Sequence, residues 1–253
     1  MDSLFSLSGR TAIVTGGARG LGRMIAEGLV VAGARVFVTS RDPDLCCAAA
    51  TEIGAEPLVG DAGSPEGIAA IGATFRATGA ATLDILVNNA GRTWGAPLET
   101  FPDKAWPGVF AVNVQAPFRM VQEFLVELSA AGRAERPSRI INIGSAVGVA
   151  YTDLPAYSYI ASKAAIHQLS RKLASDLLPR NITVNAIQPG YFATSMTAFL
   201  TEDPQSHLEE QIPMRRLGRP SEIAGAVIFL ASDAGSYLTG VELPVDGGLV
   251  GCR

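Results

Sequence analysis

The chain of 253 residues is poor in cysteine and histidine, and each shortage excludes a class of protein. Its three cysteines cannot form a disulfide framework, because Cys46 and Cys47 are adjacent and Cys252 is the penultimate residue. The two histidines, His167 and His207, lie far apart, and no metal-ligand spacing is present. We therefore expect neither a disulfide-stabilised fold nor a metal site.

Long apolar runs and an excess of positive charge are also missing. No stretch approaches the about 18 apolar residues of a membrane span, and the N-terminus lacks the basic and apolar regions of a signal peptide. Twenty basic and 24 acidic residues give a net charge of −4, which creates no field for nucleic acid. We expect a reduced, cytoplasmic protein that binds neither membranes nor nucleic acid.

Charge is scarce overall. Only 17% of the residues are charged and 48% are hydrophobic, a balance that excludes intrinsic disorder. The same fraction is low for the surface of a monomer of this length, which suggests buried contacts between subunits.

Short strand-like runs alternate with longer helical stretches along the whole chain. We expect strands at 11–15, 35–39, 56–59, 83–88, 139–144, 181–187 and 241–245, and helices at 20–32, 44–53, 65–78, 102–131, 155–178 and 220–232. Nearly continuous apolar strands separated by helices indicate an α/β fold, a doubly wound (Rossmann) parallel sheet of about seven strands with helices on both faces. No break in composition divides the chain, so we expect a single domain, 1–253, with a substrate-binding excursion at 191–218.

A glycine-rich turn follows the first expected strand. Gly16, Gly20 and Gly22 would let the backbone approach a pyrophosphate, and the helix that opens at Gly20 and Leu21 would offer free N–H donors. The spacing G-x-x-x-G-x-G differs from the commoner G-x-G-x-x-G, and an ordinary βα turn is the alternative. Its position at the first βα junction favours a dinucleotide site.

The end of the second strand distinguishes between the two nicotinamide cofactors. Ser40 and Arg41 stand where an acidic residue would bind a ribose 2′-hydroxyl, and Arg19 could place a second guanidinium against a 2′-phosphate. These residues predict NADP(H), although Asp42 follows directly and two solvated arginines are the alternative. Asp61, after the third strand, could bind the adenine amine or serve only in a turn.

Tyr159 and Lys163 lie four residues apart in the strongest expected helix, so their side chains share one face. An ammonium beside a phenol favours the ionised tyrosine, which suits a group that protonates a carbonyl oxygen as hydride reaches the carbon. Ser145 follows the fifth strand, where its hydroxyl could hold the same oxygen. Asn113 lies within a helical stretch, where it could bond a backbone carbonyl, bend the helix or hold a water. Taken singly, Ser145 and Asn113 are more often structural.

In register, these motifs resemble the short-chain dehydrogenase/reductase family over essentially the whole chain. Six matches carry the resemblance: Thr15-Gly16-x-x-x-Gly20-x-Gly22, Asn88-Asn89-Ala90-Gly91, Asn113 with Ser145, Tyr159-x-x-x-Lys163, Pro189-Gly190 with Thr194, and Val245-Asp246-Gly247-Gly248. Within the family, the chain is most similar to bacterial NADPH-dependent 3-oxoacyl (β-ketoacyl) reductases, including the type linked to rhamnolipid synthesis. Gly144 is a departure, because many relatives carry a serine there.

The resemblance implies a role for each matched residue. Tyr159 would donate the proton, Ser145 would share the carbonyl oxygen, Lys163 would bind the nicotinamide ribose and lower the pKa of the tyrosine, and Asn113 would hold a relay water. The expected cofactor-binding residues are Gly16, Arg19, Gly20, Leu21, Gly22, Ser40, Arg41, Asp61, Ala62, Asn89, Ala90, Gly91, Tyr159, Lys163, Pro189, Gly190 and Thr194. The family also implies a homotetramer, with an interface formed by the helices at 102–131 and 155–178.

We therefore predict a reductase that transfers hydride from NADPH to a ketone, with a 3-oxoacyl thioester of coenzyme A or acyl carrier protein as the expected substrate. The alternatives are an NAD(P)-dependent alcohol, sugar or steroid dehydrogenase of the same family and a non-catalytic NADP-binding regulator. Further candidates have both a functional and a structural interpretation. His167 is interpreted as a packed or interface residue rather than a relay, and His207 as exposed. An apolar substrate pocket and ordinary core or interface packing are the two interpretations of Trp94, Met196, Phe199 and Met214. Attraction of an acidic carrier protein and a solvated loop are those of Arg215, Arg216 and Arg219.

Overall fold

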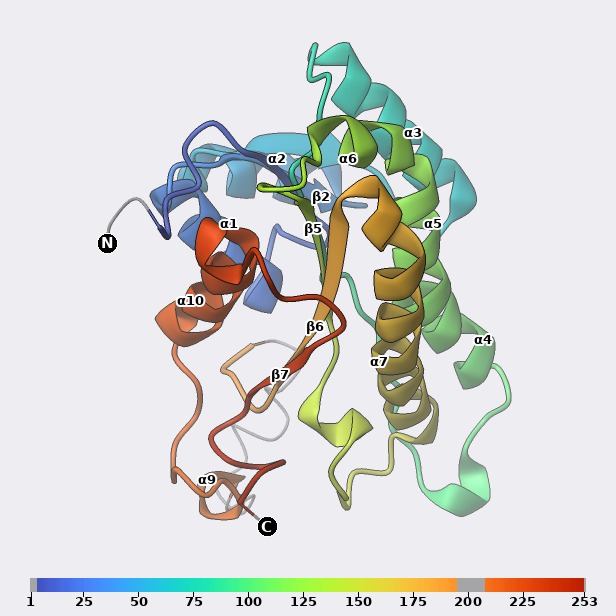
Figure 1. Cartoon of the computed structure of the whole chain (residues 1–253). Coiled ribbons are helices and arrows are strands. Elements are labelled where there is room, and N and C mark those ends of the chain that lie inside the picture. The colour runs from blue at the N-terminus through green and yellow to red at the C-terminus, as the bar shows by residue number, and fades with distance from the viewer. Residues whose placement is uncertain (1–3, 195–207, 253) are drawn as a thin grey trace.

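One parallel sheet forms the centre of the protein (Figure 1). The computed structural model describes residues 4–194 and 208–252, and within these the sheet has seven strands in the order β3-β2-β1-β4-β5-β6-β7. The strands are β1 (Thr11–Val14), β2 (Arg35–Ser40), β3 (Glu56–Val59), β4 (Ile85–Asn88), β5 (Ser138–Ile143), β6 (Ile182–Pro189) and β7 (Glu242–Val245). The order reverses between β1 and β4, and ligands bind at the carboxyl edge of such a switch point.

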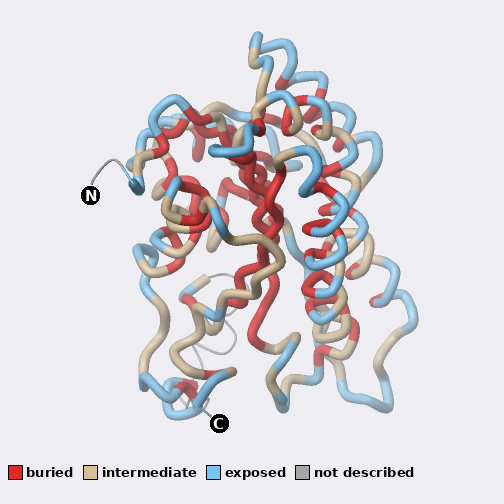
Figure 2. Tube along the Cα trace, viewed as in Figure 1, coloured by how far each residue is buried: buried red, intermediate tan, exposed pale blue. Residues whose placement is uncertain are grey.

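Helices cover both faces of this sheet. On one face pack α1 (Gly20–Val31), α2 (Pro43–Ile53) and α10 (Pro220–Ala231), and on the other α3 (Pro65–Ala77), α5 (Ala116–Glu123), α6 (Leu125–Ala131) and α7 (Tyr157–Leu177). Apolar side chains of strands β1 to β6 alternate between the two helical layers, and the central strands form the most buried part of the molecule (Figure 2). The expected doubly wound parallel sheet is confirmed.

The shorter elements lie between these. They are η1 (Leu98–Thr100), α4 (Ala105–Phe110), η2 (Ala111–Gln115), η3 (Ala146–Gly148), η4 (Leu178–Arg180), α9 (Leu208–Gln211) and η5 (Asp233–Gly235). Among the described residues no helix is long and apolar enough to cross a membrane.

The stretch expected as one helix at 102–131 is interrupted. It begins at Ala105, and α4 leads into a π-helical turn, η2, which contains Asn113. Pro117 has no N–H to donate to the carbonyl of Asn113, four residues earlier, and a π-turn is a frequent response to a missing α-helical hydrogen bond. The chain then continues as α5 and α6, so the expected stretch is largely helical but divided into shorter elements.

The two ends of the segment expected to be an excursion, 191–218, lie side by side at the edge of the sheet. Just beyond β6, Phe192 forms a β-bridge with Gly218, and the N–H of Gly218 donates to the carbonyl of Tyr191 at 2.9 Å. Met196, Phe199 and His207 lie outside the described residues.

Candidate active site

Ser145, Tyr159 and Lys163 meet at the carboxyl edge of the sheet. Ser145 follows β5 and begins η3, while Tyr159 and Lys163 are one turn apart near the start of α7. Ser145 and Tyr159 are hydrogen-bonded through their side chains, and Nζ of Lys163 lies 5.6 Å from the centroid of the tyrosine ring. The structure therefore brings together the three residues that the sequence analysis placed in the catalytic centre.

Lys163 is held in place by the backbone of β5. Its ammonium is buried, with 5% of the residue exposed, and donates a hydrogen bond to the carbonyl of Ile143 at 2.8 Å. Burial lowers the pKa of Lys163 to about 8, because desolvation disfavours the charged form. The side chain is thus a cation near neutral pH that lies beside the ring of Tyr159.

The phenol of Tyr159 has a pKa above its ordinary value. Burial is the main cause, the charge of Tyr191 adds to it, and the hydrogen bond with Ser145 acts in the opposite direction. The lowering by Lys163 that the family resemblance implies stays a prediction; in the structure the ammonium donates to the carbonyl of Ile143 and lies 5.6 Å from the centroid of the tyrosine ring. Tyr159 is therefore a protonated phenol at neutral pH.

Asn113 anchors the loop that follows β4. Its side chain, 2% exposed, accepts a hydrogen bond from the N–H of Arg92 at 2.8 Å and donates to the carbonyl of Arg92 at 2.9 Å. The second amide hydrogen goes to the hydroxyl of Ser162 on α7, also at 2.9 Å. Of the three possibilities for Asn113, the structure thus shows the bond to a backbone carbonyl, within a π-helical turn, while the bend of the helix and the relay water stay predictions.

The N-terminus of α1 is open to an anion. Neither a side-chain cap nor an acidic residue occupies its first turn, whereas Asp42 caps α2 and Ser64 caps α3. The turn before it needs glycine, because Gly20 has a φ of +53° and a Cβ on Gly22 would lie 2.3 Å from both Nδ2 of Asn89 and the carbonyl oxygen of Gly16. Uncapped N–H groups beside a glycine cradle fit a pyrophosphate.

Two arginines flank this cradle without a partner. Arg19 and Arg41 are both exposed, and neither guanidinium forms an ion pair or hydrogen bond within residues 4–194 and 208–252. Asp42, which could have opposed a phosphate here, instead accepts a hydrogen bond from the N–H of Leu45 at 3.1 Å as the cap of α2. Ser40 accepts the N–H of Asp42 at 3.2 Å. The tip of β2 thus fits a 2′-phosphate.

The remaining adenosine-side candidates line the same edge. Asp61 follows β3 and accepts the N–H of Gly63 at 2.8 Å, so it is at least a turn residue, and Ala62 beside it is buried. Asn89 donates to the carbonyls of Thr15 at 2.8 Å and Gly16 at 3.3 Å, which joins the loop after β4 to the glycine turn. Ala90 and Gly91 continue that loop toward Lys163.

The candidates at the end of β6 lie between the turn after β7 and the glycine turn. Pro189 ends the strand, and a Cβ on Gly190 would lie 2.7 Å from the backbone of Asp246. Thr194 reaches back to the glycine turn, since a Cβ on Gly20 would lie 3.6 Å from its side chain. The predicted nicotinamide residues therefore face the predicted phosphate residues.

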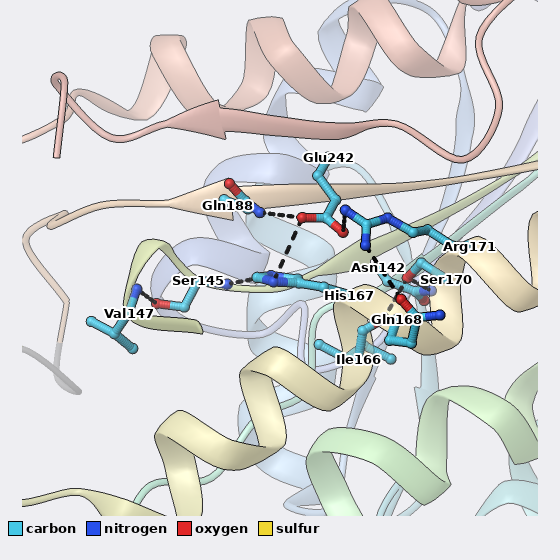
Figure 3. A network of polar contacts seen from close by, with 10 residues as sticks. All are labelled: Asn142, Ser145, Val147, Ile166, His167, Gln168, Ser170, Arg171, Gln188 and Glu242. Carbon is cyan, nitrogen blue, oxygen red and sulfur yellow. Dashed lines mark hydrogen bonds and ion pairs between the residues drawn. The ribbon is translucent and has the colours of Figure 1, made fainter. Parts of the chain in front are cut away.

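Sequence reasoning missed two supports of the site. The hydroxyl of Thr15 accepts the N–H groups of Asn89 at 2.9 Å and Ala90 at 3.0 Å. His167, expected to be packed, is indeed buried, and it also contacts the backbone of Ser145 (Figure 3). The glycine at 144, noted as a departure from the family, was the signal that could have identified the second support.

The other candidates have mostly structural partners. Arg216 forms a bidentate pair with Glu222 at 2.6 and 2.8 Å, and Arg215 donates to the carbonyl of Glu210 at 2.6 Å. Lys104 lies over the ring of Trp94 at 5.7 Å. Met214 is 64% exposed, and Arg219 is exposed as well. Met214 also lines a cavity of about 280 Å³ bordered by Tyr191 and Phe192.

The carboxyl edge of the sheet therefore carries one group of residues suited to a dinucleotide phosphate and another suited to moving a proton at an oxygen. A phosphate-binding group and a proton-transfer group that share the switch point of a doubly wound sheet define a nicotinamide-dependent oxidoreductase.

Comparisons with known proteins make this class specific. A family model described as Enoyl-(Acyl carrier protein) reductase matches residues 16–250. The rhamnolipids biosynthesis 3-oxoacyl-[acyl-carrier-protein] reductase of Pseudomonas aeruginosa is 46% identical over 254 residues, 98% of this chain and 99% of that protein. Galactitol 2-dehydrogenase (L-tagatose-forming) of Cereibacter sphaeroides is 41% identical, with 97% of each chain covered.

A solved structure agrees with these relatives. The Pseudomonas aeruginosa RhlG/NADP active-site complex superposes with a TM-score of 0.96 at 45% identity, covering 99% of this chain and 100% of the other. The chain belongs to the short-chain dehydrogenase/reductase family.

Proposed function

We propose that the protein is an NADPH-dependent reductase of 3-oxoacyl thioesters. The observation that carries the reaction is the cluster at the sheet edge, in which Ser145 is hydrogen-bonded to Tyr159 and the buried ammonium of Lys163 lies 5.6 Å from the tyrosine ring. The substrate class is supported by the 46% identity to a 3-oxoacyl-[acyl-carrier-protein] reductase over nearly the whole of both chains.

Tyr159 acts as the acid in this reaction. A bound NADPH supplies the hydride that adds to the carbonyl carbon, and the phenolic proton of Tyr159 passes to the carbonyl oxygen. Because burial raises the pKa of Tyr159, the phenol carries its proton at neutral pH, and the nearby charge of Lys163 has to offset the cost of giving it up. Ser145 donates a hydrogen bond to the same oxygen and so fixes the carbonyl beside the acid.

Lys163 supports the proton transfer electrostatically. Its charge stabilises the tyrosinate left behind, and its remaining N–H donors are available to the hydroxyls of a nicotinamide ribose. Asn113 holds the loop after β4 and a water that returns the proton to Tyr159.

The cofactor is NADP(H) rather than NAD(H). Arg19 and Arg41 would hold the 2′-phosphate, the open N-terminus of α1 the pyrophosphate, and Asp61 with Ala62 the adenine. Asn89, Ala90 and Gly91 would line the adenosine ribose, and Pro189, Gly190 and Thr194 the nicotinamide amide. We treat residues 1–253 as a single domain in which 191–218 borders the substrate.

A dehydrogenase of sugar alcohols is the second candidate. Its support is the 41% identity to a galactitol 2-dehydrogenase, which covers as much of this chain as the match to the reductase. The same residues serve both reactions, since the oxidation of an alcohol is the reverse of the reduction of a ketone.

We also propose a cytoplasmic homotetramer. Several apolar side chains are exposed along the helices at 102–131, among them Trp106 at 40%, Phe118 at 41% and Val126 at 77%. Together with the low charge fraction, these residues suit an interface with another copy of the chain.

The test is a screen of NADPH oxidation with acetoacetyl-CoA, longer 3-oxoacyl thioesters and unrelated ketones, and of NADP⁺ reduction with galactitol. We expect turnover of 3-oxoacyl thioesters, and Tyr159→Phe to abolish it while NADPH still binds. Turnover of galactitol alone would favour the second candidate. Full activity of Tyr159→Phe would contradict both.

A further inference from the structure

His167 occupies the space in which a side chain at position 144 would lie (Figure 3). A Cβ on Gly144 would be 2.1 Å from Nε2 of the imidazole, and one on Gly148 would be 2.9 Å from Cε1. The histidine is 4% exposed. The two glycines and the ring therefore form one packed unit between α7 and η3, directly behind Ser145.

The ring is bonded to the backbone of the proposed catalytic serine. The N–H of Ser145 donates to Nε2 of His167 at 3.4 Å, a long hydrogen bond. Because an accepting Nε2 carries no proton, the proton of the neutral ring is assigned to Nδ1. Nδ1 faces the Glu242 carboxylate of β7, 3.9 Å away.

The carboxylate of Glu242 is itself fixed. It accepts a hydrogen bond from Gln188 of β6 at 2.7 Å and pairs with Arg171 of α7 at 2.8 Å. In Figure 3 these side chains form a continuous row from β7 through the imidazole to Ser145. The ring is thus oriented from one side by the sheet and contacts the serine backbone on the other.

The surroundings keep His167 neutral. Burial, followed by the positive charges of Lys163 and Arg171 on α7, lowers its pKa to about 4. Glu242 is the facing charge of opposite sign from β7. A protonated ring would turn an N–H toward the N–H of Ser145, so the contact requires the neutral form.

We propose that His167 is a positioning residue: through Nε2 it holds the backbone of Ser145 so that the serine hydroxyl stays directed at Tyr159 and at the substrate oxygen. This arrangement requires glycine at position 144, because any larger residue there would displace the imidazole ring. The inference rests on the proposed role of Ser145 in catalysis.

Two substitutions distinguish the hydrogen-bond acceptor of His167 from the volume of its side chain. His167→Leu fills space without an acceptor, and His167→Gln places a carbonyl oxygen near the position of Nε2. We expect His167→Leu to lower kcat by about 10- to 100-fold, since small errors in positioning cost that much, with KM and NADPH affinity changed by less than about threefold. His167→Gln should recover most of kcat.

The pH profile supplies a readout that loss of packing alone would not move. The hydrogen bond from Ser145 lowers the pKa of Tyr159. Loosening Ser145 should therefore shift the Tyr159 limb of the kcat profile to higher pH in His167→Leu, and return it in His167→Gln.

Ser170→Ala is the matched control. Ser170 is 1% exposed on the same helix and accepts a buried hydrogen bond from Asn142 at 2.8 Å, but has no contact with Ser145 among its hydrogen bonds. We expect its kcat and pH profile to match wild type. A loss in this variant equal to that of His167→Leu, or equal losses in His167→Leu and His167→Gln, would overturn the proposal.

The contact between His167 and Gly144 allows a second, independent test. Gly144→Ser alone should be at least about tenfold less active than the double variant Gly144→Ser/His167→Ala, which has room for the new side chain. An active Gly144→Ser variant with wild-type kcat would refute the pairing. Ser145→Ala separates this inference from the proposed function: if it is fully active, the proposed site is wrong, and if it is inactive while His167→Leu is unaffected, only the positioning role is wrong.

Discussion

The preference for NADPH over NADH should depend on Arg19 and Arg41, and Arg41→Ala is the sharpest perturbation. A hydrogen bond to a charged group contributes about 1.5–3 kcal/mol, and exposure of both side chains to solvent argues for the lower end. At 1.4 kcal/mol per factor of ten, each arginine should contribute about 10-fold to NADPH affinity and the pair about 100-fold. NADH lacks the 2′-phosphate, so its affinity should change by less than about twofold.

The assay is fluorescence titration of both cofactors against wild type, Arg41→Ala, Arg19→Ala and the double variant. Arg35→Ala is the matched control, because it removes the same charge from the opposite end of β2, where Arg35 is already paired with Glu56 at 2.6 Å. The difference between the cofactors should shrink as salt is raised from about 0.05 to 0.5 M, since both arginines are exposed.

Three results would refute this reasoning. Equal affinity of the wild type for NADPH and NADH would show that the arginines do not read the phosphate. Equal loss of both cofactors in Arg41→Ala would mean that the residue supports the fold of the β2 tip. A loss of NADPH affinity of similar size in Arg35→Ala would mean that the effect of the arginines reflects only the net charge of the protein.

Three further predictions concern other parts of the chain. Gly22→Ala should lower the thermal midpoint by several degrees and weaken NADPH binding by at least about tenfold, because the new Cβ would lie 2.3 Å from Nδ2 of Asn89. Calorimetry and cofactor titration measure the two effects, and a wild-type melting curve would contradict the prediction. The free energy of unfolding should fall as pH drops from about 6.5 toward 4, because the unfolded chain takes up a proton at His167 that the folded chain, in which the pKa of His167 is about 4, does not. The loss is at most about 3 kcal/mol. Urea titrations at each pH should show a smaller loss of stability at acid pH in His167→Gln. The double variant Phe118→Glu/Val126→Glu should be a smaller oligomer than wild type by light scattering, with unchanged circular dichroism, whereas a monomeric wild type would remove the premise.

Much of the fold could be predicted because its signals are local. Apolar runs such as Ile85–Asn88 and the long helix Tyr157–Leu177 were recognisable from composition and periodicity, and Tyr159 and Lys163 share a face through spacing alone. The effect of Pro117 on η2 was equally local, and a stricter reading of proline would have found it.

What could not be predicted depends on contacts between distant segments. Whether Tyr159 has a raised or a lowered pKa depends on how deeply α7 packs it, and burial is the largest influence on that pKa. The contact between His167 and Ser145 spans 22 residues and exists only because position 144 has no side chain. Gly144 is the one sign of this pairing in the sequence, and it does not by itself show which side chain fills the space.

The bridge between Phe192 and Gly218 holds the two ends of the chain between them together at the edge of the sheet. Because the ends are already joined, a doubling of the length between them costs only about 0.6 kcal/mol in closure entropy. The fold should therefore tolerate insertions between these two residues, whereas Tyr191 and Thr194 have to stay in place because they lie beside Tyr159 and the glycine turn.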